Sequence, residues 1–327
     1  MFAIFLLLAV GISEVTCRKM HETSLRERHE EWMVRYGKVY TDAAEKEKRF
    51  LIFKDNVEFI ESFNAAANKP YQLGVNHLAD LTLEEFTASR TGLKIPRELS
   101  KTPFKYEKVS DIPEAIDWRA KGAVLPVKDQ GFCGSCWAFS AVGAIEGINK
   151  ISTGTLVSLS EQELVSCDTK GRDGGCAGGY MEDAFEFVIK NGGIASEASY
   201  PYKAVDGKCD TAAPAVVKIK GYEKVPPNSE DALKKAVANQ PVSVSLDAES
   251  RDFMLYASGV FTGQCGTELD HAVTAVGYGT ENGTDYWLLK NSWSTDWGDK
   301  GYIKMQRGIA AKSGLCGIAM DASYPTV

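Results

Sequence analysis

The chain has 327 residues, of which 44% are hydrophobic and 25% are charged, so it can bury a sizeable core and is expected to be globular. A formal net charge of -7 and an isoelectric point near 5.3 argue against nucleic acid or an anionic membrane as a partner, because both need a basic surface. The length favours two domains, or one domain with a large appendage.

The first residues, MFAIFLLLAVGIS, form an apolar run that is too short to span a bilayer and fits the apolar region of a secretory signal peptide. No Lys or Arg precedes this run. We predict a signal peptide over residues 1–20, hence entry into the secretory pathway with a lysosome, a vacuole or the cell exterior as the destination. We see no later stretch that predicts a transmembrane helix.

Residues 24–70 predict a helical region in which one stripe mixes charged, amide and apolar side chains at steps of three or four, namely Glu45, Arg49, Phe53, Asn56, Ile60 and Asn64. An ordinary amphipathic helix explains Phe53 and Ile60 but gives the asparagines no role. We therefore expect a long helix whose partner offers matching polar groups.

Residues 91–117 carry Pro96, Pro103 and Pro113 among scattered charges, which predicts an extended linker. We place a domain or processing boundary near Ile112. The segment after it begins with helical patterns. The run from Trp137 to Ile148 has the spacing of a buried helix face.

Two further helices are expected in this half. Ser160 with Glu163 predicts a capping box for a short helix that holds Leu164 and Cys167, and residues 180–193 predict a helix that stops at Gly192 or Gly193. The second half changes to strand patterns, in PVSVSLDA, HAVTAVGYG, DYWLLKNSW and GYIKMQRG. A helical lobe followed by an antiparallel sheet or barrel gives an α+β fold with lobes of roughly 100 residues each.

The eight cysteines are Cys17, Cys133, Cys136, Cys167, Cys176, Cys209, Cys265 and Cys316. Cys17 lies at the signal-peptide boundary, which leaves 8 - 1 = 7 cysteines downstream. In an oxidising compartment an odd number indicates three disulfides and one free thiol, although the spacing does not say which pairs form.

Cys133 and Cys136 form a CxxC pair, which allows a redox pair, half of a metal site, or one bonded and one free cysteine. The histidines argue against a zinc finger, which would need two of them near the paired cysteines. The chain has His21, His29, His77 and His271, and only His271 lies beyond the linker. A four-cysteine site stays open, although the chain has only one CxxC pair. Thioredoxin-like chemistry lacks the βαβ pattern that should precede the motif. The third interpretation, one bonded and one free cysteine, accounts directly for the odd number of cysteines.

Cys136 is expected in the first turn of the helix that follows, where unpaired amide groups and the helix dipole favour a thiolate. His271 could complete an ion pair with it. If residues 271–293 form a hairpin about Glu281, position 271 faces Asn291, whose amide can orient the imidazole. Gln130 and the Cys136 backbone N–H are the candidate oxyanion donors. This arrangement needs no metal or organic cofactor.

These residues resemble a papain-like cysteine peptidase made with its propeptide. The resemblance extends from about residue 25 to the C-terminus, on the helical stripe and on GVNHLAD, QGFCGSCWAFS, GCAGGY, DHAV and KNSWSTDWG. It implies a two-lobe fold, helical lobe plus antiparallel β-barrel lobe, behind an N-terminal helical propeptide. It also implies a propeptide over residues 21–111 and a mature peptidase over residues 112–327.

The resemblance assigns Cys136 as nucleophile, His271 as base and acid, Asn291 as orienter and Gln130 to the oxyanion hole. It implies the disulfides Cys133–Cys176, Cys167–Cys209 and Cys265–Cys316. It gives Trp293 a shielding role over the contact between His271 and Asn291, and it lets Gly178 and Gly179 pair with the substrate backbone. The pocket for the second residue before the cut would be lined by Met181, Ser245, Leu269, Ala272 and Asp321.

Apolar walls in that pocket predict a preference for Leu, Val or Phe, while Asp321 at its far end would admit Arg. Asp321 as a surface acid near the C-terminus is the alternative. The chain departs from the family pattern at Leu78, where GxNxFxD usually has Phe, and at Ser294, where KNSWG has Gly. Asn282 lies in an NGT sequon on the expected hairpin turn, which predicts glycosylation.

The sequence therefore predicts a monomeric cysteine endopeptidase, made as a zymogen, that acts on proteins and peptides in general protein degradation and is inhibited by its own propeptide. Two other functions are compatible with the residues. One is a catalytically silent homologue that works as a binding or inhibitory protein. The other is acyl transfer, as in transglutaminase-like enzymes that also use Cys and His.

Overall fold

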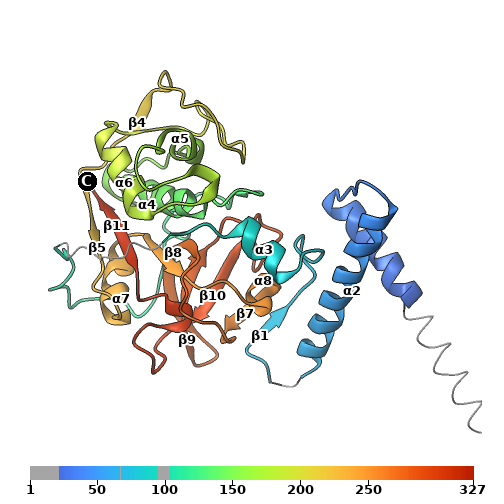
Figure 1. Ribbon diagram of the computed structural model, residues 1–327. Helices are drawn as coiled ribbons and strands as arrows, with labels where there is room; N and C mark the ends of the chain where they lie inside the picture. Colours follow the sequence, from blue (N-terminus) through green and yellow to red (C-terminus); the bar gives the residue numbers. More distant parts are fainter. Residues whose placement is uncertain (1–21, 67, 95–102) are drawn as a thin grey trace, which may run out of the picture.

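The computed structural model describes residues 22–66, 68–94 and 103–327, so the predicted signal peptide at residues 1–20 lies outside the described residues. Helices and strands separate into two layers (Figure 1). The helices α4 (Cys136–Thr153), α5 (Glu161–Cys167) and α6 (Met181–Lys190) lie together on one side, and most strands lie on the other. The expected α+β architecture with a helical lobe is confirmed.

Helix α4 is the centre of the helical lobe. Most of its side chains are buried, because it packs against α6 and α5 on one side and against strand β8 (His271–Glu281) on the other. It runs one residue before and five beyond the predicted 137–148, and it ends at Gly154, whose φ of +78° provides the left-handed stop.

Helix α5 confirms only half of the predicted capping box. The Ser160 hydroxyl accepts the Glu163 N–H at 3.0 Å. The Glu163 carboxylate does not return to Ser160, because it accepts hydrogen bonds from the Ala195 N–H and the Asn191 amide instead. Helix α6 follows the prediction, and the N–H groups of Gly192 and Gly193 bond back to its last turn.

The sheet runs in the order β1-β7-β10-β9-β8-β6-β11-β5, with β2 (Ile116–Asp117) attached to β8. The remaining members are β1 (Tyr71–Leu73), β5 (Gly221–Lys224), β6 (Val242–Leu246), β7 (Tyr256–Phe261), β9 (Thr284–Lys290), β10 (Tyr302–Gln306) and β11 (Ala322–Thr326). All pairs are antiparallel except β10 with β7. The strands β1, β5, β7 and β11 were not predicted, because each is short and lacks a clean alternation.

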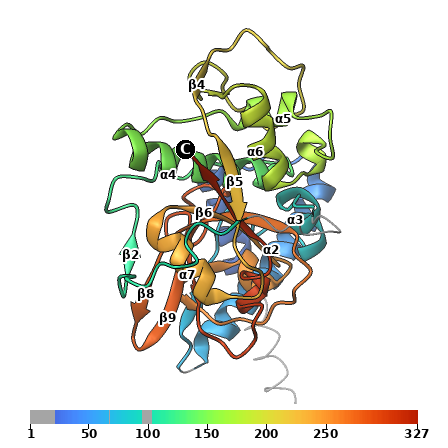
Figure 2. The same cartoon turned by 90° about the vertical axis from the view of Figure 1, so that its left-hand side faces the viewer.

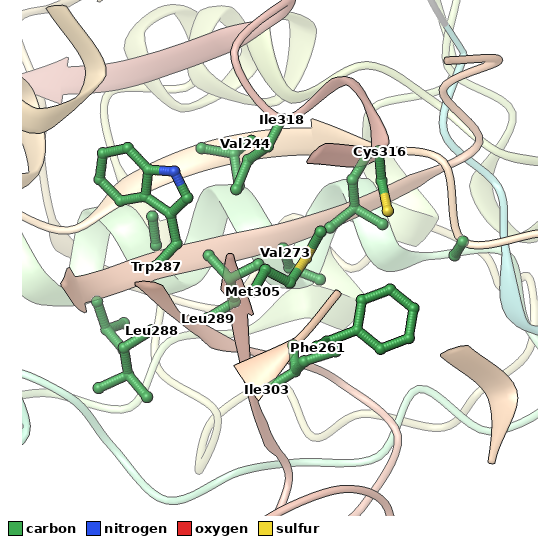
Figure 3. Close-up of a cluster of buried hydrophobic side chains, with 14 of the residues drawn as sticks. Val244, Phe261, Val273, Trp287, Leu288, Leu289, Ile303, Met305, Cys316 and Ile318 are labelled. Atoms are coloured by element: carbon green, nitrogen blue, oxygen red, sulfur yellow. The ribbon is translucent and has the colours of Figure 1, made fainter. Parts of the chain in front are cut away.

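One face of this sheet carries the core of the strand lobe (Figure 3). Val244, Val273, Leu289, Ile303 and Met305 come from neighbouring strands and are at most 2% exposed. Helix α7 (Glu230–Asn239) packs against β8 of this lobe (Figure 2), and α8 (Arg251–Met254) contacts α3. A two-stranded pair of β3 (Ile194–Ala195) and β4 (Ala215–Val217) lies on the helical lobe.

The hairpin of β8 and β9 corrects the expected register. Glu281 pairs with Thr284, so the turn is Asn282–Gly283 and not a turn about Glu281. Both turn residues have positive φ, 51° and 80°, as the Asn-Gly dipeptide favours. A register shift between Ala275 and Gly277 follows, and the ladder ends at Thr274 with Lys290. Position 291 therefore does not face position 271 within the ladder.

The N-terminal region forms a helix over residues 22–36, then α2 (Ala43–Ala65), β1 and α3 (Leu83–Arg90). The region predicted as helical over 24–70 is therefore divided, and α2 is the long helix expected to carry the mixed stripe. Gly37, with a φ of +61°, ends the first helix, and Asp42 caps the second. In Figure 1, α2 stands to one side of the lobes, and α3 reaches the boundary between helices and strands.

The mixed stripe of α2 meets the matching polar partner that the sequence predicts. Asn56 donates to the carbonyls of Ala79 and Leu81, and its oxygen accepts from Arg251. Asn64 exchanges two hydrogen bonds with Leu73. Strand β1 pairs with β7, so the N-terminal region extends the sheet of the strand lobe.

We expect Asn56→Ala to lower the free energy of unfolding by about 1–3 kcal/mol, because the substitution leaves two buried carbonyls without their donor. The measurement is denaturant unfolding of the full chain. Ser62→Ala, at an exposed position of the same helix, should change stability by less than about 0.5 kcal/mol. Equal effects of the two substitutions would show that the asparagine contacts contribute nothing.

Candidate active site

Cys136 is the first residue of α4 and is fully buried. It is the free cysteine of the described residues, since Cys133–Cys176, Cys167–Cys209 and Cys265–Cys316 are disulfides, as the resemblance implies. No side chain in the described ranges caps α4; the hydroxyl of the N-cap residue, Ser135, meets that of Tyr202 instead. The amide groups of Ala138 and Phe139 donate to the Ser135 carbonyl, and that of Trp137 interacts with the sulfur.

His271 begins β8, and its Nε2 lies 2.8 Å from Asn291 Oδ1. The amide oxygen also accepts the Ser292 N–H at 2.8 Å, which orients it. Trp293 stacks on the imidazole with ring centroids 4.4 Å apart and is fully buried. The contact predicted between His271 and Asn291 is present, although Asn291 reaches it from beyond the end of β9 and not from the ladder position assumed.

The sulfur and the imidazole are brought to the same place. Backbone N–H groups of Trp137, Ala272 and Gly92 interact with the Cys136 thiol, and Ala272 directly follows His271. His271 Nδ1 has no hydrogen-bond partner in the described part of the chain and is shielded from solvent. The second ring nitrogen is thus left for the thiol.

Both groups are neutral in this closed form. Burial raises the pKa of Cys136 to about 12 despite the three N–H groups near its sulfur. Burial also lowers the pKa of His271 to about 4, against the opposing effect of the Asn291 hydrogen bond. The absence of water therefore disfavours the thiolate and the imidazolium together.

Gln130 is fully buried, and both ends of its amide are used. Its nitrogen donates to the carbonyls of Arg90 and Cys133, at 3.0 and 2.9 Å. Its oxygen accepts from the Ser292 hydroxyl and the Trp293 indole, which sets the direction of the nitrogen. A carbonyl of the N-terminal region therefore occupies the donor expected to serve an oxyanion.

The segment after α3 lies against the chain around Cys136 and Gly179. Gly179 donates to the Gly92 carbonyl at 2.9 Å and accepts from the Lys94 N–H at 2.9 Å, a parallel pairing centred on Leu93. A Cβ on Gly92 would lie 2.2 Å from the Gly134 carbonyl oxygen, and one on Gly178 would lie 2.3 Å from that of Gly92. The backbones meet this closely because glycines face one another.

The five predicted pocket residues split into two groups. Met181, Ala272 and Leu269 belong to the same apolar cluster as Leu93. Ser245 and Asp321 are polar and also buried, and the serine hydroxyl donates to the Asp321 carboxylate at 2.8 Å. The alternative of Asp321 as a surface acid is wrong, because Asp321 is 3% exposed.

Asp321 also has a cationic partner that the sequence did not reveal. Lys224 Nζ lies 2.9 Å from Asp321 and 2.9 Å from Glu182, and all three side chains are at most 9% exposed. Burial, together with the charge of Asp321, raises the pKa of Glu182. Lys224 lies on β5, a strand without a sequence signal, so only the pairing of β5 with β11 could show this contact.

The two departures from the family pattern have local consequences. Leu78 is fully buried, so it fills a core position without the larger ring. Ser294 has a φ of +65°, the left-handed conformation that a glycine adopts without steric cost. The strand contacts beside it persist, since the Ser294 N–H donates to the Lys128 carbonyl at 3.1 Å.

No helix among the described residues is both long and apolar enough to cross a membrane. The same part of the chain holds no group of three or more His, Cys, Asp or Glu side chains arranged to bind a metal ion.

Comparisons with known proteins agree across the whole length. Residues 112–326 match the papain family cysteine proteases, and residues 29–86 match the cathepsin propeptide inhibitor domain. The senescence-specific cysteine protease SAG39 of Oryza sativa subsp. indica is 54% identical over 332 residues, which cover 100% of this chain and 98% of that protein. The probable cysteine protease RD21C of Arabidopsis thaliana is 54% identical over 98% of this chain and 73% of its own length.

Solved precursors share the fold. The recombinant stem bromelain precursor has a TM-score of 0.86 and 48% identity, with 93% of this chain and 99% of that chain covered. The proform of the ragweed pollen allergen Amb a 11 has a TM-score of 0.86 and 45% identity, with 93% and 94% covered. This chain belongs to the papain family of cysteine proteases and is made as a proenzyme with an N-terminal inhibitor domain.

Proposed function

We propose that Cys136, His271, Asn291 and Gln130 carry out peptide-bond hydrolysis through an acyl-enzyme. The Cys136 thiolate attacks the peptide carbonyl, and Gln130 with the Cys136 N–H stabilises the oxyanion. His271 then gives its proton to the leaving amine, which breaks the C–N bond. Water, deprotonated by His271, attacks the thioester and releases the acid and the thiol.

The observation that carries these roles is the burial of one free thiol beside an imidazole whose far nitrogen is held by Asn291. Asn291 keeps the ring in place while remaining neutral, so it does not compete for the proton. Trp293, packed on the ring, excludes water from that hydrogen bond.

The precursor would be divided into a signal peptide at 1–20, a propeptide at 21–111 and an endopeptidase at 112–327, with cleavage near Ile112. A route through the secretory pathway to a vacuole, a lysosome or the cell exterior suits the three disulfides. Asn282 lies at the exposed hairpin turn, which supports its glycosylation there. Protein and peptide substrates, a monomeric enzyme and a role in general protein degradation complete the proposal.

Substrate preference at the second residue before the cut should be apolar. Leu93 occupies the cluster of Met181 and Ala272 in the precursor, as a substrate leucine would. Gly178 and Gly179 would bind the backbone at this point, in place of the propeptide segment.

Mild acidification of the purified precursor should lower its mass to that of a chain starting near Ile112, and hydrolysis of a fluorogenic peptide should appear with it. Intact mass and activity are followed together. Cys136→Ala should abolish the activity, because no other free thiol lies at the cleft among the described residues. Peptidase activity retained by the activated Cys136→Ala variant would refute the assignment.

Peptides with Leu at the second position before the cut should be cleaved better than peptides with Arg by about tenfold or more, because Lys224 already neutralises charge at Asp321. The ratio of kcat/KM for the two peptides is measured on the wild type and on Asp321→Ala. If Asp321→Ala leaves this ratio unchanged, Asp321 does not contribute to the pocket.

Acid should weaken the binding of the propeptide to the catalytic domain. We propose that His77 senses the mildly acidic range, in addition to the carboxylate of Glu85. Both ring nitrogens of His77 are shielded and without hydrogen-bond partners in the described residues. Burial lowers its pKa to about 4, with Arg90 and Lys38 adding repulsion and Asp129 opposing them. Tyr36 packs on the ring.

The pKa of His77 is depressed in the folded precursor, so the opened chain binds a proton first as the pH falls. The contribution of neutral His77 to stability is fully present above 6.5, the ordinary pKa of histidine. It is lost as the pH falls from there through about 4. Glu85 acts only at lower pH: partial burial opposes the shift, but Arg49, the Thr82 N–H and Lys48 bring its pKa to about 2. Asp80 accepts hydrogen bonds from Lys38 and Tyr40 in the same region.

We therefore expect His77→Gln to flatten the dependence of stability on pH between 6.5 and about 4. The measurement is the free energy of unfolding of the Cys136→Ala precursor, which cannot process itself, with and without His77→Gln. The slope of the unfolding free energy against pH should fall by the amount that corresponds to at most one bound proton. Parallel curves for the two proteins would exclude His77 as the sensor.

A further inference from the structure

The side chain of Arg90, the last residue of α3, is buried against the catalytic domain. Its guanidinium lies 3.0 Å from the Asp129 carboxylate, and its Cζ lies 4.8 Å from the centre of the Phe132 ring. Arg90 is only 4% exposed, yet Phe132 is 67% exposed even with Arg90 in place. An exposed aromatic ring next to a carboxylate has the chemistry of a cation site.

Asp129 is held in place by contacts within the catalytic domain. Asp129 Oδ1 accepts the Gly131 N–H at 2.9 Å, and Asp129 pairs with Trp293 through an antiparallel bridge. The next residue, Gln130, donates its N–H to the Ser292 carbonyl at 2.8 Å. The loop that presents the carboxylate is therefore held by the segment that carries Trp293.

Removal of the propeptide would leave this carboxylate available. Lys128, its chain neighbour, is bound to Glu161 and Glu197 and to the Leu159 carbonyl, so it does not neutralise Asp129. Lys38 and His77, which act on the same region, belong to the propeptide and would leave with Arg90.

The position of Arg90 along the cleft assigns the site to one part of the substrate. The Arg90 carbonyl accepts from Gln130 and Trp293, whereas Leu93 pairs with Gly179 in parallel. If this segment runs opposite to a substrate and Leu93 stands for the second residue before the cut, Arg90, three residues toward the N-terminus, stands for the second residue after it.

We propose that Asp129 and Phe132 form a subsite that selects a basic side chain, Arg above Lys, at the second residue after the scissile bond. The guanidinium stacks on the Phe132 ring and pairs with Asp129, as Arg90 does in the precursor. Lys has no planar group to stack, so it gains less. This inference rests on the proposed peptidase function and adds a preference on the leaving-group side.

The test uses the activated enzyme and quenched fluorescent peptides that share Leu at the second position before the cut. They differ only at the second position after it, which carries Arg, Lys, Glu or citrulline, the neutral isostere of Arg. We expect kcat/KM for Arg to exceed that for citrulline about three- to thirtyfold. The ratio should fall with added salt. Mass analysis of the products confirms the cleaved bond.

Two variants test the residues separately. Asp129→Asn and Phe132→Leu should each lower the ratio of Arg to citrulline towards one while leaving kcat/KM for the citrulline peptide within about twofold. The same pair of side chains at the third position after the cut is the positional control and should show a ratio near one.

A wild-type ratio near one, or a ratio that neither variant changes, would overturn the subsite. A ratio reduced by Asp129→Asn alone would overturn the part assigned to Phe132. These outcomes are distinct from a failure of the proposed function, in which the citrulline peptide itself would not be cleaved.

Discussion

The exclusion of water from Cys136 is the constraint on which the rest of the cleft depends. The thiol lies at the start of α4, between the helical lobe and the first residues of β8, and the segment of Gly92 closes the remaining side. In this dry environment the sulfur and the imidazole of His271 are both neutral. Uncovering the cleft would return water to both groups and favour their charged forms, so the same helix start can hold an inert thiol and later a reactive thiolate.

The segment after α3 achieves this closure through the groups proposed above to bind a substrate. Gln130 binds a propeptide carbonyl, Gly179 pairs with the propeptide backbone, and Leu93 joins the apolar cluster of Met181. The backbone of Leu93 pairs with that of Gly179 in the parallel direction. The segment is anchored at a distance by the polar stripe of α2 and by strand β1, so its place in the cleft depends on contacts far from the reacting atoms.

A buried ion network supports the cleft from behind. Lys128 pairs with Glu161 at 2.7 Å, and a small cavity between the lobes is lined by Lys128, Glu146, Glu161 and Lys290 beside Asn291. Burial raises the pKa of Glu161, and the charge of Lys128 opposes this shift by favouring the carboxylate. Because buried charges are costly without their partners, the network favours one relative placement of the lobes and of the chain around Asn291.

The sequence by itself determined the chemistry and the local elements. The odd number of cysteines, the histidine beyond the linker and the CxxC before a helix predicted a free thiol with an imidazole, and the periodic patterns predicted α4, α5, α6, β6, β8, β9 and β10. These features could be predicted because they depend on neighbours along the chain, such as helical spacing, strand alternation and caps.

Only the tertiary structure decided what distant segments do to one another. The turn at Asn282–Gly283 and the bulge displaced the expected register, yet Asn291 still reached His271 because the chain continues beyond the end of β9. Lys224 beside Asp321, and Arg90 between Asp129 and Phe132, join residues separated by long stretches of chain. Such contacts leave no periodic signal, because side chains far apart in sequence meet only after the lobes and the propeptide have packed.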